Sequence, residues 1–422
     1  MSRILLLGDH NFRDTPALAA IRVQIERIDP AHEVRIISFD LWQQAIDLFK
    51  PHVIVLNHLH GKRNQMASDL VRRRGGQCVV LPTEGRPNSV ERITWAANEW
   101  AHDLCDLYLG WSEEFCKNLP EKVWYSVVGG PRFDFYSLPL KSLIMSPSEV
   151  KERLGLNLSE PVVTVASSFP QAKFIESGGD FHTNDWRDLK MTTIPGHEDP
   201  ILFAQKELDA LHVMKNFLYY LRQKMPKIQI VLKPHPSEAL RMWWEFCDEN
   251  SIVMMLTDYI WNLLSVSDCH VVRADCLTTC EAWMMSVPVI TVDAGNAGEN
   301  GPGKEAMDMT TVPHNEVDFV SSIMVLLERG TIPRNAQEYI RKWLTIGESS
   351  TYRIAEAIVA LLKDKSPQVS PPPIDDIIAL EVALKEHNTL NSVPKSDHIG
   401  QFGKAITRSS SDLWVEKIRP LL

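Results

Sequence analysis

The sequence predicts an α/β protein built from two Rossmann-like domains that face each other across a cleft. Short apolar runs typical of buried strands alternate with amphipathic stretches typical of helices through most of the chain, which is the pattern of helix-covered parallel sheets. This pattern occurs twice, on either side of a proline-containing stretch at residues 137–161. At about 150 residues per domain, 422 residues leave room for two domains and an extension.

The first series of elements predicts an N-terminal domain over residues 1–140. Helices are expected at 15–28, where a proline lies near the start, and at 66–74, where two glycines follow as a C-cap. Strands are expected at residues 4–7, 33–38, 53–56, 78–81 and 125–128. Because a Rossmann-like unit joins parallel strands through crossover helices, this alternation fits one such unit.

The second series predicts a C-terminal domain over residues 162–364. Residues 141–161 are expected to link the domains through a short helix capped by Ser146 or Ser148. Strands are expected at 162–166, 228–232, 252–255, 270–272 and 287–292, and helices at 200–224, 237–250, 259–266, 277–285 and 317–329. Residues 170–199 have no clean period, which is typical of lids and binding loops. Residues 365–422 read as a proline-rich linker, a helix at 374–385 and a polar tail.

Composition restricts the classes of function. Lys and Arg number 44 against 54 Asp and Glu, so the net charge is −10 and nucleic acid is not an expected partner. No apolar run approaches the roughly 20 residues that cross a bilayer, and Asp9 interrupts the opening apolar run, so a cytoplasmic protein is expected. The seven cysteines include no Cys-x-x-Cys pair, and His58 and His60 have no third ligand nearby, so disulfides and metal sites are not expected.

The most informative motif is Lys-Pro-His-Pro at 233–236, directly after the predicted strand at 228–232. Ligands of open α/β sheets bind at the carboxyl ends of the strands, and two prolines hold Lys233 and His235 on a rigid turn there. A cation and an imidazole on such a turn suit a phosphate, and a helix beginning at Ser237 would add positive potential. In the alternative interpretation, His235 only caps neighbouring carbonyl groups.

A second candidate segment follows the predicted strand at 270–272. Asp275, Thr278 and Thr279 lie where the next helix is expected to begin, so hydroxyl groups and helix amides can face an anion. The carboxylate of Glu281 can accept both hydroxyls of a ribose, or it can cap the helix amides instead. Beside the motif at 233–236, this segment predicts a nucleotide site.

Glu84 is the candidate general base. It lies next to a glycine after the predicted strand at 78–81, where a carboxylate can take the proton of an acceptor hydroxyl. The alternative is that Glu84 pairs with Arg86 or Arg92 within a turn.

Three other segments follow predicted strands. Ser167 and Ser168 come after the strand at 162–166, where their hydroxyls can bind phosphate or cap a helix. Residues 8–11 follow the first strand and can contact an acceptor. The Gly-Gly-Pro-Arg run that ends at Arg132 lacks the Gly-x-Gly-x-x-Gly order, which argues against a dinucleotide fingerprint.

Four motifs resemble those of bacterial surface-carbohydrate biosynthesis proteins, a group of GT-B-type glycosyltransferases and their relatives. The motifs are Thr-Glu-Gly at 83–85, Val-Gly-Gly-Pro-Arg-Phe-Asp at 128–134, Lys-Pro-His-Pro at 233–236 and Thr-Thr-Cys-Glu-Ala at 278–282. The Glu-Gly and His-Pro pair is similar to that of bacterial sialyl-, polysialyl- and Kdo-transferases, which use CMP-activated sugars. This resemblance implies that Glu84 deprotonates the acceptor and that His235 contacts the donor phosphate. The chain departs from the pattern at Thr83, where many relatives carry an acid, and at Gly130, where others carry Asn.

Together these observations predict an inverting GT-B glycosyltransferase of surface polysaccharide (capsule or lipopolysaccharide) biosynthesis. It would move a sugar from a nucleotide donor, CMP-linked by preference, to a glycan acceptor, with no metal or other cofactor. Glu84 and His235 are the expected catalytic residues, and the expected substrate contacts are Lys233, Ser167, Ser168, Asp275, Thr278, Thr279, Glu281 and Arg132. A lipid-linked acceptor would bring the protein to the inner face of the cytoplasmic membrane. The alternatives are a UDP-sugar 2-epimerase, a non-catalytic nucleotide-sugar-binding subunit and a polyol-phosphate transferase.

Overall fold

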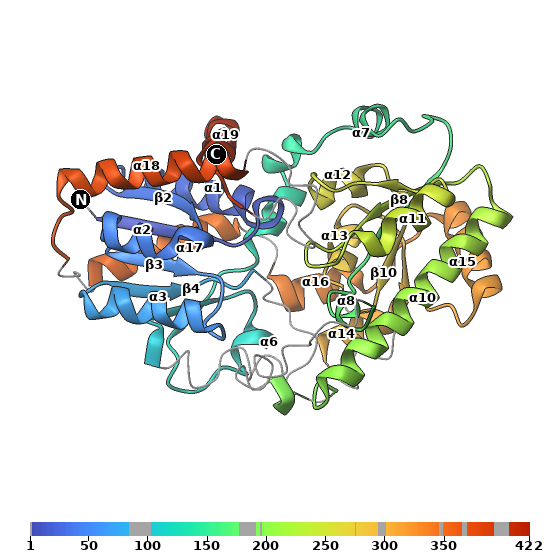
Figure 1. Ribbon diagram of the computed structural model, residues 1–422, viewed down its shortest axis with the longest axis horizontal. Coiled ribbons are helices and arrows are strands. Elements are labelled where there is room, and N and C mark those ends of the chain that lie inside the picture. The colour runs from blue at the N-terminus through green and yellow to red at the C-terminus, as the bar shows by residue number, and fades with distance from the viewer. Residues whose placement is uncertain are drawn as a thin grey trace.

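Two separate parallel sheets form the centre of the protein (Figure 1). This computed structural model describes residues 2–83, 103–176, 191–194, 196–274, 276–293, 301–345, 349–364, 369–391 and 405–422. The strand order is β2-β1-β3-β4-β5-β6 in the first sheet and β11-β10-β7-β8-β9 in the second, and every pair is parallel. The predicted class, α/β with two Rossmann-like domains, is therefore confirmed. We call each sheet with its helices the first and the second domain.

Most strands are buried along their whole length, because helices cover both faces of a parallel sheet. Their bounds are β1 (Arg3–Gly8), β2 (Glu33–Ser38), β3 (Val53–Leu56), β4 (Gln77–Val80), β5 (Leu107–Gly110), β6 (Tyr125–Val127), β7 (Val162–Ala166), β8 (Gln229–Lys233), β9 (Val253–Met254), β10 (Cys269–Arg273) and β11 (Val289–Val292). The sequence analysis missed β5, which has only four residues but pairs with both β4 and β6.

The helices of the first half begin and end at recognisable signals. They are α1 (Asn11–Ile28), α2 (Trp42–Phe49), α3 (Lys62–Arg73), α6 (Glu113–Cys116) and α7 (Pro147–Arg153), with short 3₁₀ turns η1 (Phe39–Leu41), η2 (Pro131–Tyr136) and η3 (Leu140–Leu143). Ser146 caps α7 through a capping box with Glu149, as one of the two predicted caps. Gly75, with φ of 84°, follows the end of α3 in the left-handed conformation expected of a glycine there.

The helices of the second half surround the second sheet. They are α8 (Ala172–Glu176), α10 (Pro200–Lys224), α11 (Arg241–Glu249), α12 (Ile260–Ser265), α13 (Thr278–Met284), α14 (Pro302–Asp308), α15 (Glu316–Arg329) and α16 (Ala336–Leu344), with the turn η4 (Met191–Thr193). Helix α10 has the predicted bounds, because Asp199 caps its first amides and a proline occupies its first position. The prediction of a helix from residue 237 is wrong, because α11 begins only at Arg241.

The C-terminal part of the chain returns to the first domain. Helices α17 (Ser350–Asp364) and α19 (Arg408–Ile418) pack on α1, and α18 (Ile374–Asn391) packs on α2 (Figure 1). Helix α18 begins where a helix was predicted and extends six residues further, and α19 lies where a polar tail was expected. Both helices cover the first domain. None of the described helices is both long and apolar enough to cross a membrane.

Aromatic rings join the two domains. The ring of Phe135 in η2 stacks on Trp261 of α12, with centroids 4.9 Å apart, and Trp261 stacks on Tyr259 at 4.7 Å. Trp414 of α19 meets this stack edge-on and donates its indole N–H to the Tyr259 hydroxyl at 2.7 Å. The C-terminal helix therefore contacts both domains at the point where they meet.

Candidate functional site

The carboxyl end of β1 in the first domain lies close to the carboxyl end of β8 in the second. Phe12, at the start of α1, connects them: its ring centre lies 5.9 Å from Nζ of Lys233 and 5.3 Å from the ring centre of Tyr259. Lys233 ends β8, and Tyr259 directly precedes α12. The strand ends that open α/β sheets use to bind ligands therefore meet at the domain boundary.

Lys233 is a partly buried cation. Its Nζ donates to the carbonyl oxygen of Asp258 at 2.5 Å and faces the ring of Phe12, and no ion pair joins it to a carboxylate of the described residues. Burial lowers the pKa of Lys233 from 10.5 to about 8. Because a buried ammonium group is costly without a negative partner, its environment suits a bound anion.

His235 lies on the turn that follows β8. Its Nδ1 accepts a hydrogen bond from the backbone amide of Ser237 at 3.1 Å, so the proton of the neutral ring is on Nε2. The helix N-terminus predicted beside this ring is displaced to Arg241, because the intervening residues form a turn that buries Glu238.

Glu238 ties this turn to the loop after β7. Its carboxylate accepts hydrogen bonds from the Ser167 hydroxyl at 2.7 Å, the Trp243 indole N–H at 2.8 Å and the backbone amide of Phe169. Burial raises the pKa of Glu238 to about 7 in spite of these donors. The hydroxyl of Ser167, predicted to face a phosphate, is therefore engaged by a carboxyl group that the sequence analysis did not single out.

The same loop is held by a second buried carboxylate. Arg273, at the end of β10, pairs with Glu207 of α10 at 2.8 Å and also donates to the carbonyl oxygen of Ser168. Glu207 in turn accepts from the backbone amide of Gln171 at 2.6 Å. The loop after β7 is thus fixed on both sides, and the structure uses the backbone of Ser168 in that support.

The start of α13 rests on a buried histidine. His270 of β10 contacts the Thr164 hydroxyl through Nδ1 at 2.7 Å and the Thr278 hydroxyl through Nε2 at 3.1 Å. Its burial lowers the pKa of His270 to about 3, so the ring is neutral. Thr279 beside it is buried, and Asp275 lies outside the described residues.

Glu281 forms an ion pair across the domain boundary. Nη2 of Arg132 in η2 lies 2.8 Å from both carboxylate oxygens, and the Tyr136 hydroxyl donates to one of them at 2.9 Å. Glu281 is 1% exposed, so this carboxylate links α13 to the first domain. Two residues that the sequence analysis treated separately, Arg132 and Glu281, are therefore direct partners.

The turn between β1 and α1 is closed by Asp14. Its buried carboxylate accepts from the backbone amides of Asp9 and His10, both at 2.9 Å, and pairs with Arg13 at 2.7 Å. This places His10 at the domain boundary beside Phe12, with 6.3 Å between their ring centres. Residues 8–11 were predicted from the sequence as a segment that can contact an acceptor, but Arg13 and Asp14 were given no role.

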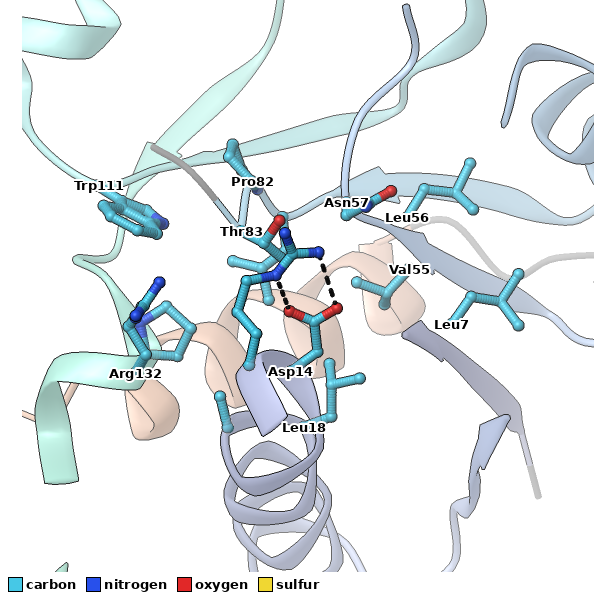
Figure 2. A pocket seen from close by; sticks show the side chains of 14 residues that line it. Leu7, Asp14, Leu18, Val55, Leu56, Asn57, Pro82, Thr83, Trp111 and Arg132 are labelled. Carbon is cyan, nitrogen blue, oxygen red and sulfur yellow. Dashed lines mark hydrogen bonds and ion pairs between the residues drawn. The ribbon is translucent and has the colours of Figure 1, made fainter. Parts of the chain in front are cut away.

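A pocket of about 430 Å³, part of it open to solvent, lies at the carboxyl ends of β1, β3, β4 and β5. Figure 2 shows Trp111 and Arg132 on one side of it and Asn57 and Leu56 on the other, with Asp14 between them. Most of the lining is apolar. Thr83 also lines the pocket, and the next residue, Glu84, lies outside the described residues.

Metal-ligand geometry is not found in the part of the chain that the structure describes, where no three His, Cys, Asp or Glu side chains gather around one point. His58 and His60 stack on each other instead, with ring centres 3.7 Å apart.

Two facing Rossmann-like domains, with C-terminal helices that return to the first, define the GT-B architecture. The structure of S. aureus MnaA with UDP shares it, with 10% identity, 88% of this chain and 100% of that chain covered, and a TM-score of 0.54. The UDP-GlcNAc 2-epimerase of Methanocaldococcus jannaschii aligns with 12% identity over 85% of this chain and 100% of that chain, at a TM-score of 0.51. The wall teichoic acid polymerase TagF aligns with 10% identity over 86% of this chain and 89% of that chain, at a TM-score of 0.55.

At these identities the likeness establishes the fold alone. No protein-family model matches the sequence, and a comparison with curated proteins finds no relative.

Proposed function

We propose that the chain is an inverting GT-B glycosyltransferase of bacterial surface polysaccharide biosynthesis, which takes its sugar from a nucleotide-linked donor. The observation that carries this proposal is Lys233, a partly buried ammonium group at the end of β8 whose pKa burial lowers and that no ion pair joins to a carboxylate of the described residues. A donor phosphate supplies the negative charge that this position lacks. The place of Lys233 at the domain boundary, where strand ends of both sheets meet, supports a ligand shared by the two domains.

In the proposed reaction the acceptor oxygen bonds to the anomeric carbon as the bond from that carbon to the donor phosphate oxygen breaks. The phosphate leaves with the electron pair, and Lys233 and His235 stabilise its developing charge. Glu84 takes the proton of the acceptor hydroxyl, as the family resemblance implies. The pocket beside Thr83 and Arg132 would hold the acceptor, and the fixed cations would supply the electrostatic stabilisation without a metal ion.

The nature of the donor and acceptor follows from the resemblance and from the neighbours. The resemblance to sialyl- and Kdo-transferases favours a CMP-linked sugar, whereas one structural neighbour is a complex with UDP. A wall teichoic acid polymerase among the neighbours supports a surface-glycan acceptor. A lipid-linked acceptor would be reached from the cytoplasmic side of the membrane.

A 2-epimerase is the second candidate, because one structural neighbour is the UDP-GlcNAc 2-epimerase of Methanocaldococcus jannaschii and another is a complex with UDP. An epimerase isomerises its nucleotide-sugar without an acceptor. The likeness to TagF similarly keeps polyol-phosphate transfer as an alternative.

Mass spectrometry of reaction mixtures separates these activities. Purified protein would be incubated with CMP- and UDP-sugars, with and without glycan acceptors, and compared with Lys233→Met and with Lys227→Met, an exposed lysine just before the same strand. We expect transfer that falls on the order of 100-fold in Lys233→Met and is unchanged in Lys227→Met. Isomerisation without acceptor would establish the epimerase instead, and nucleotide binding without any product would establish the non-catalytic subunit.

A further inference from the structure

His10 is a buried side chain whose two ring nitrogens lack hydrogen-bond partners among the described residues. It is 7% exposed, and neither of its ring nitrogens has a hydrogen-bond partner in the described part of the chain. Native proteins leave few buried polar atoms in this condition, because each costs free energy that a partner would recover. An explanation in terms of a ligand is therefore warranted.

Hydrogen bonds to its backbone fix the position of His10. Asp14 accepts the backbone amide of His10, and the His10 carbonyl accepts the backbone amides of Arg13 and Asp14. The backbone of this residue is thus fixed from both sides, while its imidazole has no hydrogen-bond partner among the residues that the structure describes. The ring lies beside Phe12, which also lies against Nζ of Lys233 in the other domain.

Charged and titratable groups from both domains lie near enough to this ring to act on it electrostatically. Arg13 and Asp14 come from α1, and Lys233 and His235 come from the turn after β8. Burial and the cations lower the pKa of His10 to about 3, so the ring is neutral in this structure. A neutral imidazole among cations gains a charge-assisted hydrogen bond only when an anion arrives.

We infer that His10 contacts, from the first domain, the phosphate that Lys233 and His235 bind in the second. This inference rests on the proposed function, since it needs a phosphate at that turn. Binding of the anion offsets the repulsion from Lys233 and Arg13, so the ring takes up a proton from solvent and donates it in a hydrogen bond to a phosphate oxygen. The donor would then be held by both domains, and its affinity would fall as the pH rises.

Calorimetry with UDP, CDP and CMP as probes tests this inference. Titrations at about pH 7 in two buffers of different ionisation enthalpy measure the protons taken up on binding. We expect uptake in the wild type that is reduced in His10→Gln by up to about one proton, together with an affinity lowered about 10- to 100-fold. His314→Gln, at an exposed histidine, is the matched control and should behave as the wild type.

A second variant separates the contact from a folding effect. Because neither nitrogen of His10 has a partner among the described residues, His10→Leu should melt at or above the wild-type temperature without nucleotide, yet lose the nucleotide-induced rise. Affinity and proton uptake unchanged in both variants would overturn the role of His10 while leaving the proposed function standing. If no nucleotide binds to the wild type, the proposed function and this inference both fail.

Discussion

Three buried or partly buried basic residues near the domain boundary differ in how their charges are balanced. Arg132 pairs with Glu281, and Arg273 pairs with Glu207, each at 2.8 Å. Lys233 instead donates to the backbone carbonyl oxygen of Asp258, and its ammonium group lies over the ring of Phe12. Paired charges of the first kind are typical of structural links, whereas Lys233 has the character of a binding residue.

Replacement of Lys233 by methionine should therefore stabilise the protein in the absence of ligand. The lowering of its pKa from 10.5 to about 8 corresponds to a cost of roughly 3 kcal/mol for the buried charge, against about 1 kcal/mol for the lost hydrogen bond. A base with a lowered pKa destabilises the folded state below about pH 8, and this effect disappears as the pH approaches 10.5.

Thermal melts from pH 7 to pH 10 measure this difference. We expect Lys233→Met to melt above the wild type at pH 7, with the gap closing as the pH rises. A variant that melts below the wild type at pH 7 would mean that a negative partner balances the charge of Lys233 in the folded protein.

At the scale of elements, two loops on the second sheet behave as one unit. Glu238, after β8, accepts from Ser167 and Phe169 after β7, and Arg273 and Glu207 hold the same loop from the other side. The turn that carries His235 is thus supported by its neighbours rather than by a helix N-terminus. Its geometry depends on a carboxyl group that itself need not touch a substrate.

Glu238→Gln should loosen the contact between the two loops. In the variant, the side-chain NH2 group replaces one of the two carboxyl oxygens that now accept from Ser167, Phe169 and Trp243. The pKa of Glu238 is raised to about 7, so it stabilises the fold most below its ordinary pKa of about 4.5, and that stabilisation is lost as the pH rises through 7. The melting temperature of the variant should lie below that of the wild type at pH 5, and the gap should narrow by pH 8.

Glu249→Gln, an exposed residue at the end of α11, is the control for this experiment. A gap that stays constant with pH would show that Glu238 does not titrate in this range.

Sequence reasoning succeeded for elements whose signals are local. Helix α10 carries its own cap and proline, and the structure has the bounds that were predicted for it. Helix α11 was placed too early, because Ser237 and Glu238 look like a helix start and the sequence does not show that Glu238 turns inward to Ser167. The strand β5 was missed because four residues carry too little pattern.

In the candidate site, too, the sequence predicted the parts that have a local signal and missed the contacts between distant residues. The turn at Lys233 and His235 was found because prolines and a strand end are visible in the sequence. The pairing of Arg132 with Glu281 joins residues 149 positions apart, and no local pattern reports such a contact. His10 belongs to the segment 8–11 that the sequence offered only as an acceptor contact, and its ring is singled out by its burial and its neighbours in space.

At the scale of the whole molecule, the C-terminal helices fasten the domains together. Trp414 of α19 is 6% exposed and contacts Tyr259, Trp261 and Phe135, so it joins the last helix to both domains. Tyr259 also lies against Phe12, and Phe12 lies against Lys233. The candidate site and the C-terminal helix are thus parts of one packed cluster.

Trp414→Ala should cost about 3–5 kcal/mol of stability, because the cavity left at the domain boundary cannot close easily. Urea unfolding followed by circular dichroism measures this cost. Leu413→Ala removes an exposed side chain of the same helix, 49% exposed, and should cost little. Equal costs for the two variants would show that α19 contributes nothing specific to the joining of the domains.

Hydrogen exchange measured by mass spectrometry, with and without a nucleotide, locates a bound ligand along the chain and so tests whether a phosphate binds between the two domains. We predict slower exchange in peptides that cover residues 8–14, 233–240 and 276–284, in the wild type but not in Lys233→Met. Protection restricted to other parts of the chain, or the same protection in Lys233→Met, would contradict a phosphate site at the boundary between the two domains.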